Sequence, residues 1–263
     1  MSLLDDLRAA DIDARVAAIG ALARQGRATR EELAVLADSL GHARKLVQRR
    51  GAEAFAALAA AGVEVREVLA TALAAPAAGR RWGAAYALAL IGDLSAPAIG
   101  VILETLGSED GDLRWAAASI LRQRHDDKAL IDALTSLVGK GTAPARKMAL
   151  YCLRDLGARS AEIESKVLGA LDDADRDVRL AAIATLAQLA LDPATAADRL
   201  MHALGDGDDR VRRAAAAALG SLGRASEDVL AALRRASADP DRSLRRAAEG
   251  ALRRLAEFTR QPQ

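Results

Sequence analysis

The chain has 263 residues, with 37 Lys and Arg against 36 Asp and Glu, and a single cysteine. This near-zero net charge selects no class of partner, and one cysteine excludes a disulfide framework. No apolar run approaches the ~18 residues that a membrane helix needs. The first residues also lack the basic-then-apolar pattern of a secretion signal. We therefore expect a cytoplasmic protein that makes no membrane contact.

An arginine recurs along the chain at a spacing of 33 residues, shortened once to 32. These anchor arginines are Arg15, Arg81, Arg114, Arg146, Arg179, Arg212 and Arg245, and Gln48 fills the one remaining position. Seven residues after each anchor stands a large apolar residue: Leu22, Phe55, Leu88, Leu121, Leu153, Leu186, Leu219 and Leu252. A fixed period of this length is typical of a repeat architecture.

Each repeat contains two amphipathic helices. The second, or B, helix contains the anchor, and its apolar residues fall on one stripe at helical spacing. The first, or A, helix is marked by Leu3, Leu36, Leu69, Ile102, Leu134, Val167, Leu200 and Leu233. Asp-rich joints precede several B helices, as before Val178 and Val211. Aspartate suits such a position because it accepts hydrogen bonds from free N–H groups of the first turn.

The sequence thus predicts an all-α fold, an α-solenoid of about eight two-helix repeats in a right-handed superhelix. No single helix pair can bury its apolar stripe alone, so neighbouring pairs must stack. The unbroken period predicts one domain over residues 1–263. Its expected repeats cover residues 3–25, 29–61, 63–92, 94–124, 126–157, 158–190, 194–223 and 225–258.

The best-preserved repeat reads D-x-x-V-R-x-x-A-x-x-A-L-G from Asp208 to Gly220. This pattern resembles HEAT-like repeats, in particular the short bacterial kind first named from phycobilisome lyases. The resemblance extends from about Leu3 to Phe258. It implies that the B helices line the concave surface of the solenoid. It does not imply one function, because such arrays serve many tasks.

The B-helix positions one, five and eight residues after each anchor are expected to point away from the core. Both tryptophans and both tyrosines of the chain occupy such positions in repeats three to five, namely Trp82, Tyr86, Trp115 and Tyr151. We expect them to form one aromatic patch. Such a patch favours partner recognition, because large rigid side chains are typical of interface centres. The alternative is that the rings pack on one another for stability.

The same positions hold seven cations and one acid. The cations are Arg49, Arg122, Lys147, Arg154, Arg213, Arg246 and Arg253, and the acid is Glu53. This sorting of charge suggests an acidic partner, although a solvated helix face is an equal alternative. The predicted binding residues are Trp82, Tyr86, Trp115, Tyr151, Arg49, Arg122, Lys147, Arg154 and Glu53. The anchor arginines are instead expected to form a structural Asp–Arg ladder between neighbouring repeats.

No phosphate-binding glycine motif is present, and the three histidines fall at unrelated places in the repeat. We therefore expect neither a cofactor nor a metal site. The predicted function is a non-catalytic scaffold that binds a partner protein or peptide. The main alternative is a protein that binds nucleic acid, with phosphates on the arginines and bases stacked on the aromatic rings. A third hypothesis, suggested only by the name of the repeat family, is tetrapyrrole attachment.

The tryptophans and basic positions resemble in outline the alkylpurine DNA glycosylases of HEAT-like fold. In that comparison Glu53 is the one candidate for the catalytic acid on the expected concave surface. However, Tyr86 and Ser119 stand one helical turn from the tryptophans, where that family would place an acid. The sequence therefore predicts no enzyme.

Overall fold

The computed structural model describes residues 2–258, and all of the regular structure in that range is helical. The chain divides into two compact units, residues 1–105 and 106–263, which are described separately. The division falls between the two helices of the fourth expected pair. The predicted single solenoid and its superhelical hand therefore stay predictions. The sequence also predicts a frayed tail at residues 259–263, and these residues lie outside the described range.

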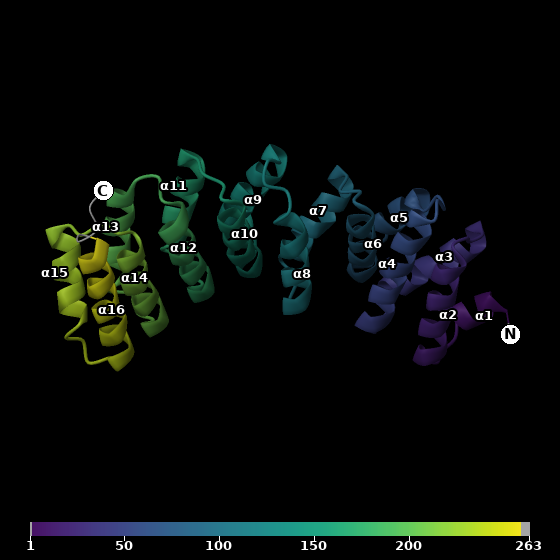
Figure 1. Ribbon diagram of the computed structural model, residues 1–263, viewed down its shortest axis with the longest axis horizontal. Coiled ribbons are helices and arrows are strands. Elements are labelled where there is room, and N and C mark those ends of the chain that lie inside the picture. The colour runs from purple at the N-terminus through teal and green to yellow at the C-terminus, as the bar shows by residue number, and fades with distance from the viewer. Residues whose placement is uncertain (1, 259–263) are drawn as a thin grey trace. The chain divides into compact units, whose positions relative to one another are not determined.

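The first unit contains seven α-helices and one short 3₁₀ helix in the described range (Figure 1). They are α1 (Leu3–Leu7), α2 (Ile12–Gln25), α3 (Arg30–Asp38), η1 (Ser39–Gly41), α4 (Lys45–Ala60), α5 (Arg66–Leu73), α6 (Ala78–Ile91) and α7 (Ala96–Thr105). The B helices α2, α4 and α6 pack side by side, and each contacts the A helix of its own pair or the adjoining 3₁₀ turn.

The second unit continues the same alternation over its described residues. Its helices are α8 (Gly111–Leu121), α9 (Lys128–Lys140), α10 (Ala143–Leu156), α11 (Ala161–Ala170), α12 (Arg176–Leu189), α13 (Pro193–Ala203), α14 (Asp209–Ser221), α15 (Glu227–Ala236) and α16 (Arg242–Phe258). The B helices α10, α12, α14 and α16 form one row, and α9 contacts α11 as α13 contacts α15 (Figure 1). The predicted alternation of A and B helices is confirmed within each unit, whereas the pairing of α7 with α8, which belong to different units, stays a prediction.

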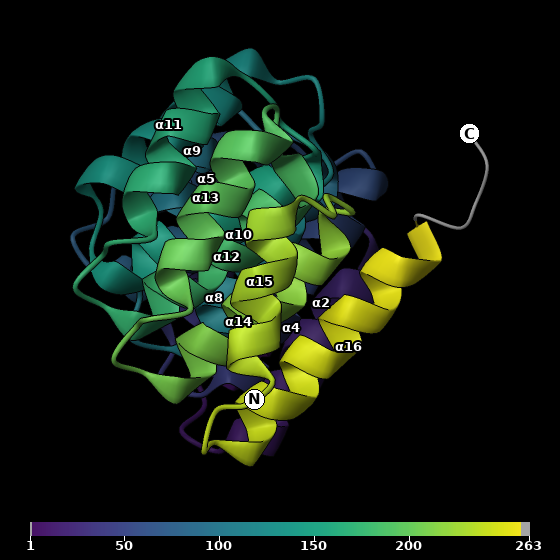
Figure 2. The same cartoon turned by 90° about the vertical axis from the view of Figure 1, so that its left-hand side faces the viewer.

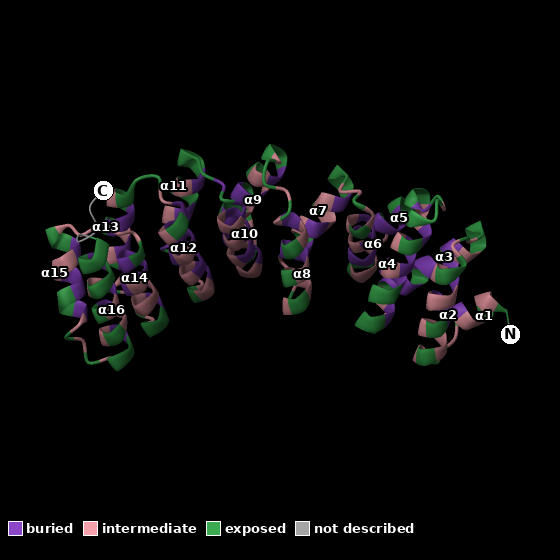
Figure 3. Cartoon of the chain, in the orientation of Figure 1, coloured by how far each residue is buried: buried purple, intermediate pink, exposed green. Residues whose placement is uncertain are grey.

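The core is made of the apolar residues that the period identified. Leu121, Leu153, Leu186 and Leu219 are buried on successive B helices of the second unit. Leu252, on the last helix, is only partly buried. The buried residues gather where A and B helices face each other (Figure 3). Removing this apolar surface from water contributes roughly 25 cal/mol of free energy per Å² and stabilises the packing of the helices.

Capping side chains fix several helix starts. Asp110, Asp175 and Asp208 each accept N–H groups from the first turn of α8, α12 and α14. Thr29 and Glu32 form a reciprocal capping box at α3. The joints whose sequences lack this chemistry, before α4 and α6, have no side-chain cap.

The anchor arginines join successive repeats, as predicted. Arg146 donates two hydrogen bonds of 2.7 Å to the carboxylate of Asp173 in the next repeat. Arg179 makes the equivalent pair with Asp206 at 2.9 and 3.0 Å. Arg179 also donates to the backbone carbonyl of Asp173 in its own repeat, at 2.8 Å. One guanidinium thus ties together two joints, and the predicted Asp–Arg ladder is confirmed for these repeats.

Candidate binding surface

The aromatic residues predicted to bind a partner form two stacked pairs. Trp82 and Tyr86, one turn apart on α6, have ring centroids 5.8 Å apart and planes inclined by 24°. Trp115 on α8 and Tyr151 on α10 have centroids 6.1 Å apart and planes inclined by 15°. The first pair belongs to the first unit and the second pair to the second unit. A single patch of all four rings therefore stays a prediction.

The expectation that Trp82 points outward is wrong. Only 6% of the residue is exposed. Stacking on Tyr86 covers part of the indole, since residues four apart lie above one another on a helix. Trp82 is thus a packing residue, and the structural alternative holds at this position.

Trp115 behaves in the opposite way, with 48% of the residue exposed. Its ring rests on Tyr151, which in turn carries the guanidinium of Arg154 at 4.9 Å from its centroid. Such an arrangement of aromatic rings and a cation is favourable because the ring faces are negative. We call Trp115, Tyr151 and Arg154 the aromatic stack.

Asp155 holds Arg154, the cation of the aromatic stack, in place. Its carboxylate accepts hydrogen bonds from Arg154 at 2.7 Å and from Arg122, the C-cap residue of α8, at 2.9 Å. Arg122 also donates to Ser119 Oγ at 2.9 Å. Burial by itself would raise the pKa of Asp155, but the hydrogen bonds from Arg154 and Arg122 outweigh it and hold this pKa below its usual value. The carboxylate is therefore ionised at neutral pH and fixes both guanidinium groups.

The other basic residues of the predicted site also have carboxylate partners. Lys147 Nζ lies 3.0 Å from Asp177 Oδ2 on α12. The hydrogen bond from Lys147 is the main reason that the pKa of Asp177 is lowered. In the first unit, Arg49 and Arg50 both pair with Glu53, at 3.3 and 2.9 Å. The predicted excess of positive charge is thus largely neutralised at these positions.

The sequence-based reasoning missed the two aspartates that do this. Asp155 lies nine residues after its anchor and Asp177 lies two residues before its own, so neither occupies the three outward positions that were compared. The sequence signal for the first pair was that Asp155 directly follows Arg154. A long side chain at an outward position can reach an acid at a neighbouring position. A comparison of the outward positions alone does not detect such a pair.

The single cysteine of the chain is not activated as a nucleophile. Cys152 is fully buried, and burial is the main cause that raises its pKa to about 12. The thiol is therefore protonated at neutral pH and has little reactivity. Within residues 2–258, no group of three or more His, Cys, Asp or Glu side chains is arranged to hold a metal ion.

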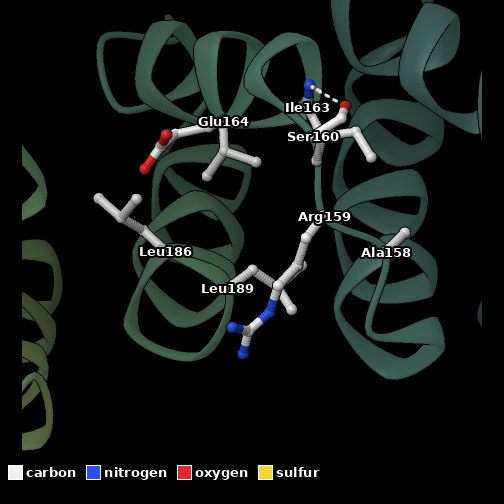
Figure 4. A pocket seen from close by; sticks show the side chains of 8 residues that line it. Ala158, Arg159, Ser160, Ile163, Glu164, Leu186 and Leu189 are labelled. Atoms are coloured by element: carbon white, nitrogen blue, oxygen red, sulfur yellow. Dashed lines mark hydrogen bonds between the residues drawn. The ribbon is translucent and has the colours of Figure 1, made fainter. Parts of the chain in front are cut away.

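A small depression lies between α11 and α12 (Figure 4). Ile163, Leu186 and Leu189 supply its apolar lining. The polar groups at its rim are occupied by backbone: Glu164 accepts the N–H group of Leu191 at 2.9 Å, and Arg159 donates to the carbonyl of Gln188 at 3.0 Å. Ser160 Oγ likewise accepts the N–H group of Ile163 at 3.2 Å, so these polar groups serve the joint between the helices.

None of the helices in the described part of the chain is long and apolar enough to cross a membrane.

Comparison with known proteins agrees with the repeat pattern. Residues 163–253 match the family model of HEAT repeats. YibA of Escherichia coli has a similar fold, with a TM-score of 0.59 and 18% identity over 97% of this chain and 91% of YibA. No curated protein sequence matches the chain.

Two larger solved structures are also similar. Importin beta has a TM-score of 0.63 at 15% identity, and the match covers 99% of this chain but 41% of importin beta. Kap95p, from a structure with RanGDP, has a TM-score of 0.63 at 12% identity over 97% of this chain and 40% of the other. At these identities the likeness shows the fold, which is that of α-solenoid HEAT-repeat proteins.

Proposed function

We propose that this HEAT-repeat protein is a non-catalytic scaffold that binds a partner protein or peptide along its B helices. The observation that carries this proposal is Trp115, an indole half exposed to water on a supported stack. The fold is compatible with such a role, and the structural relative Kap95p was solved with RanGDP.

The aromatic stack suits binding because it is held in place before the partner arrives. Tyr151 supports one face of the Trp115 ring, and Asp155 fixes the Arg154 that lies over Tyr151. Little side-chain freedom is then lost on association, a cost of about 0.5–1.5 kcal/mol for each mobile side chain. Covering the exposed indole surface with a partner also makes the free energy of binding more favourable.

The part of the partner that meets this stack is apolar or aromatic. Lys147, Arg122 and Arg154 already have carboxylate partners, so a partner carboxylate here would have to displace an internal one. The electrostatic reason for an acidic partner, as predicted from the sequence, does not apply at the aromatic stack.

Affinity capture from cells that make the protein tests this proposal. The wild type, Trp115→Ala and Trp115→Phe are compared, with Ser136→Ala on the exposed side of α9 as the control. We expect one set of proteins to be captured by the wild type and by Ser136→Ala, reduced by Trp115→Ala and largely restored by Trp115→Phe. Equal capture by Trp115→Ala would refute the proposed surface.

A nucleotide base can also stack on an exposed indole, so a DNA titration distinguishes nucleic acid from a protein partner. Trp82→Phe leaves Trp115 as the sole indole, and its fluorescence is titrated with single-stranded and duplex DNA at about 50 and about 300 mM salt. We expect no saturable change at either salt. A salt-sensitive, saturable change would replace the protein-binding proposal by nucleic-acid binding.

A further inference from the structure

Three cations on the last two B helices differ from those around the aromatic stack. Arg213 on α14 and Arg246 and Arg253 on α16 occupy the outward positions of the repeat. Over residues 2–258, none of the three makes an ion pair with a carboxylate. We call Arg213, Arg246 and Arg253 the arginine triad.

The acids near the arginine triad do not form ion pairs with it in the described chain. The carboxylate of Asp209, one turn before Arg213, is bound by Arg212, and Arg213 itself donates to the backbone carbonyl of Asp209 at 3.3 Å. Glu249 lies between Arg246 and Arg253 in sequence and forms an ion pair with neither of them in the described chain. The surface therefore keeps an excess of positive charge, unlike the positions of Arg122, Lys147 and Arg154.

The two helices that hold the triad pack closely. A Cβ atom on Gly220 of α14 would lie only 2.7 Å from the Cα atom of Ala251 on α16. Arg254 also donates from α16 to the carbonyl of Ala217 on α14, at 3.2 Å. The two helices lie at the C-terminal end of the second unit, with α16 in front in Figure 2. The triad thus rests on one supported surface.

The spacing of the triad indicates what it can bind. Arg246 and Arg253 are two helical turns apart, or about 10 Å along α16. A polyproline II chain repeats its side-chain direction every third residue, a rise of about 9 Å. Carboxylates at every third position of such a chain therefore match the two arginines. The outward positions between them, Ala217 and Gly250, offer no ring on which a nucleotide base could stack.

We infer that the arginine triad binds an acidic, extended segment of the partner protein, separate from the apolar segment at the aromatic stack. This inference rests on the proposed scaffold function, whose surface it extends along the same row of B helices. The sequence predicts that an acidic partner binds near the centre of the chain. The inference places the binding of an acidic segment on α14 and α16 instead.

A defined peptide tests this inference without knowledge of the natural partner. The probe is a fluorescein-labelled peptide of about five Glu-Pro-Pro units, and the matched peptide has Gln-Pro-Pro units. Fluorescence anisotropy measures binding to the full chain, to Arg213→Ala/Arg246→Ala/Arg253→Ala and to a control triple, Arg224→Ala/Arg234→Ala/Arg235→Ala. The control removes the same charge from exposed positions of the same unit. Circular dichroism confirms that both variants are folded.

We expect the Glu peptide to bind the wild type and the control triple equally, and the triad variant about tenfold more weakly, as for three exposed charge pairs. The Gln peptide should not bind. An equal loss of peptide affinity in both triple variants would show that only net charge matters and would overturn the inference. Tighter binding of a thymidine oligonucleotide of about 15 nucleotides than of the Glu peptide would also overturn it. Trp115→Ala should leave binding of this peptide unchanged, so failure of the aromatic stack and failure of the triad are distinguishable.

Discussion

Two tryptophans in equivalent positions of neighbouring repeats have different roles. Trp82 is buried at 6% exposure, whereas Trp115 is exposed at 48%. We expect Trp82→Ala to reduce the free energy of unfolding by about 3–5 kcal/mol, because truncation leaves a cavity. Trp115→Ala should cost less than about 1 kcal/mol, as is usual at exposed positions. Urea unfolding followed by circular dichroism measures both, and equal losses would contradict this assignment of roles.

Quenching of fluorescence by acrylamide checks the same difference in solution. Trp82→Phe leaves only Trp115, which should emit at long wavelength and be quenched strongly. Trp115→Phe leaves only Trp82, whose emission should lie at shorter wavelength and resist quenching. If the two single-tryptophan variants were quenched alike, the burial of Trp82 would be wrong.

The Arg146–Asp173 pair should make stability depend on pH. Burial alone would raise the pKa of Asp173, but the hydrogen bonds from Arg146 and from the Asp175 N–H group outweigh it, so the pKa is lowered. A lowered pKa in the folded state contributes stability above the unfolded value of about 3.9, and this contribution is lost as pH falls through the folded pKa.

We therefore expect Asp173→Asn to cost about 1–3 kcal/mol near pH 7, and the difference from the wild type to shrink as pH falls below about 4. Urea unfolding at both pH values measures this. Lys128→Gln serves as the control, because its exposed pair with Asp132 should contribute little. A difference that grows in acid would contradict the role of Asp173.

At the scale of the helix, one glycine is required by close packing. A Cβ atom on Gly83 of α6 would lie 2.3 Å from the carbonyl oxygen of Leu40, a backbone atom that cannot move aside. Gly100 of α7 has no atom within 4 Å of the same position. We expect Gly83→Ala to lower the thermal midpoint clearly, and Gly100→Ala to leave it unchanged or raise it, because alanine favours helix by up to about 1 kcal/mol. The reverse order would show that α6 packs differently against the 3₁₀ turn.

The helices were predictable because each one follows from local chemistry repeated along the chain. The leucine positions fixed the buried stripes, and caps such as Asp175 and Asp208 fixed where B helices start. The site was predictable only in part. Whether a ring at an outward position is exposed depends on how it stacks, as for Trp82. Whether a cation lacks an ion pair depends on acids on other helices, such as Asp155, which pairs with Arg122. Neither property belongs to a single sequence position.

At the scale of the whole molecule, each unit has its own buried core. In the second unit the B helices bury Leu153, Leu186 and Leu219 among helices of that unit. Stability in repeat proteins is approximately a sum over repeats and their nearest neighbours. We therefore expect a fragment of residues 106–263 to be helical and to unfold cooperatively in urea. A fragment without a cooperative transition would contradict the independence of this core.

The most direct test of the scaffold function is photo-crosslinking in the cells that make the protein. A benzophenone amino acid replaces Trp115, and in a parallel experiment it replaces Ser136 on α9 of the same unit. We predict a discrete protein adduct at position 115, resistant to nuclease and absent at position 136. No adduct at position 115, or the same adducts at both positions, would contradict the claim that the B-helix face around the aromatic stack binds a partner protein.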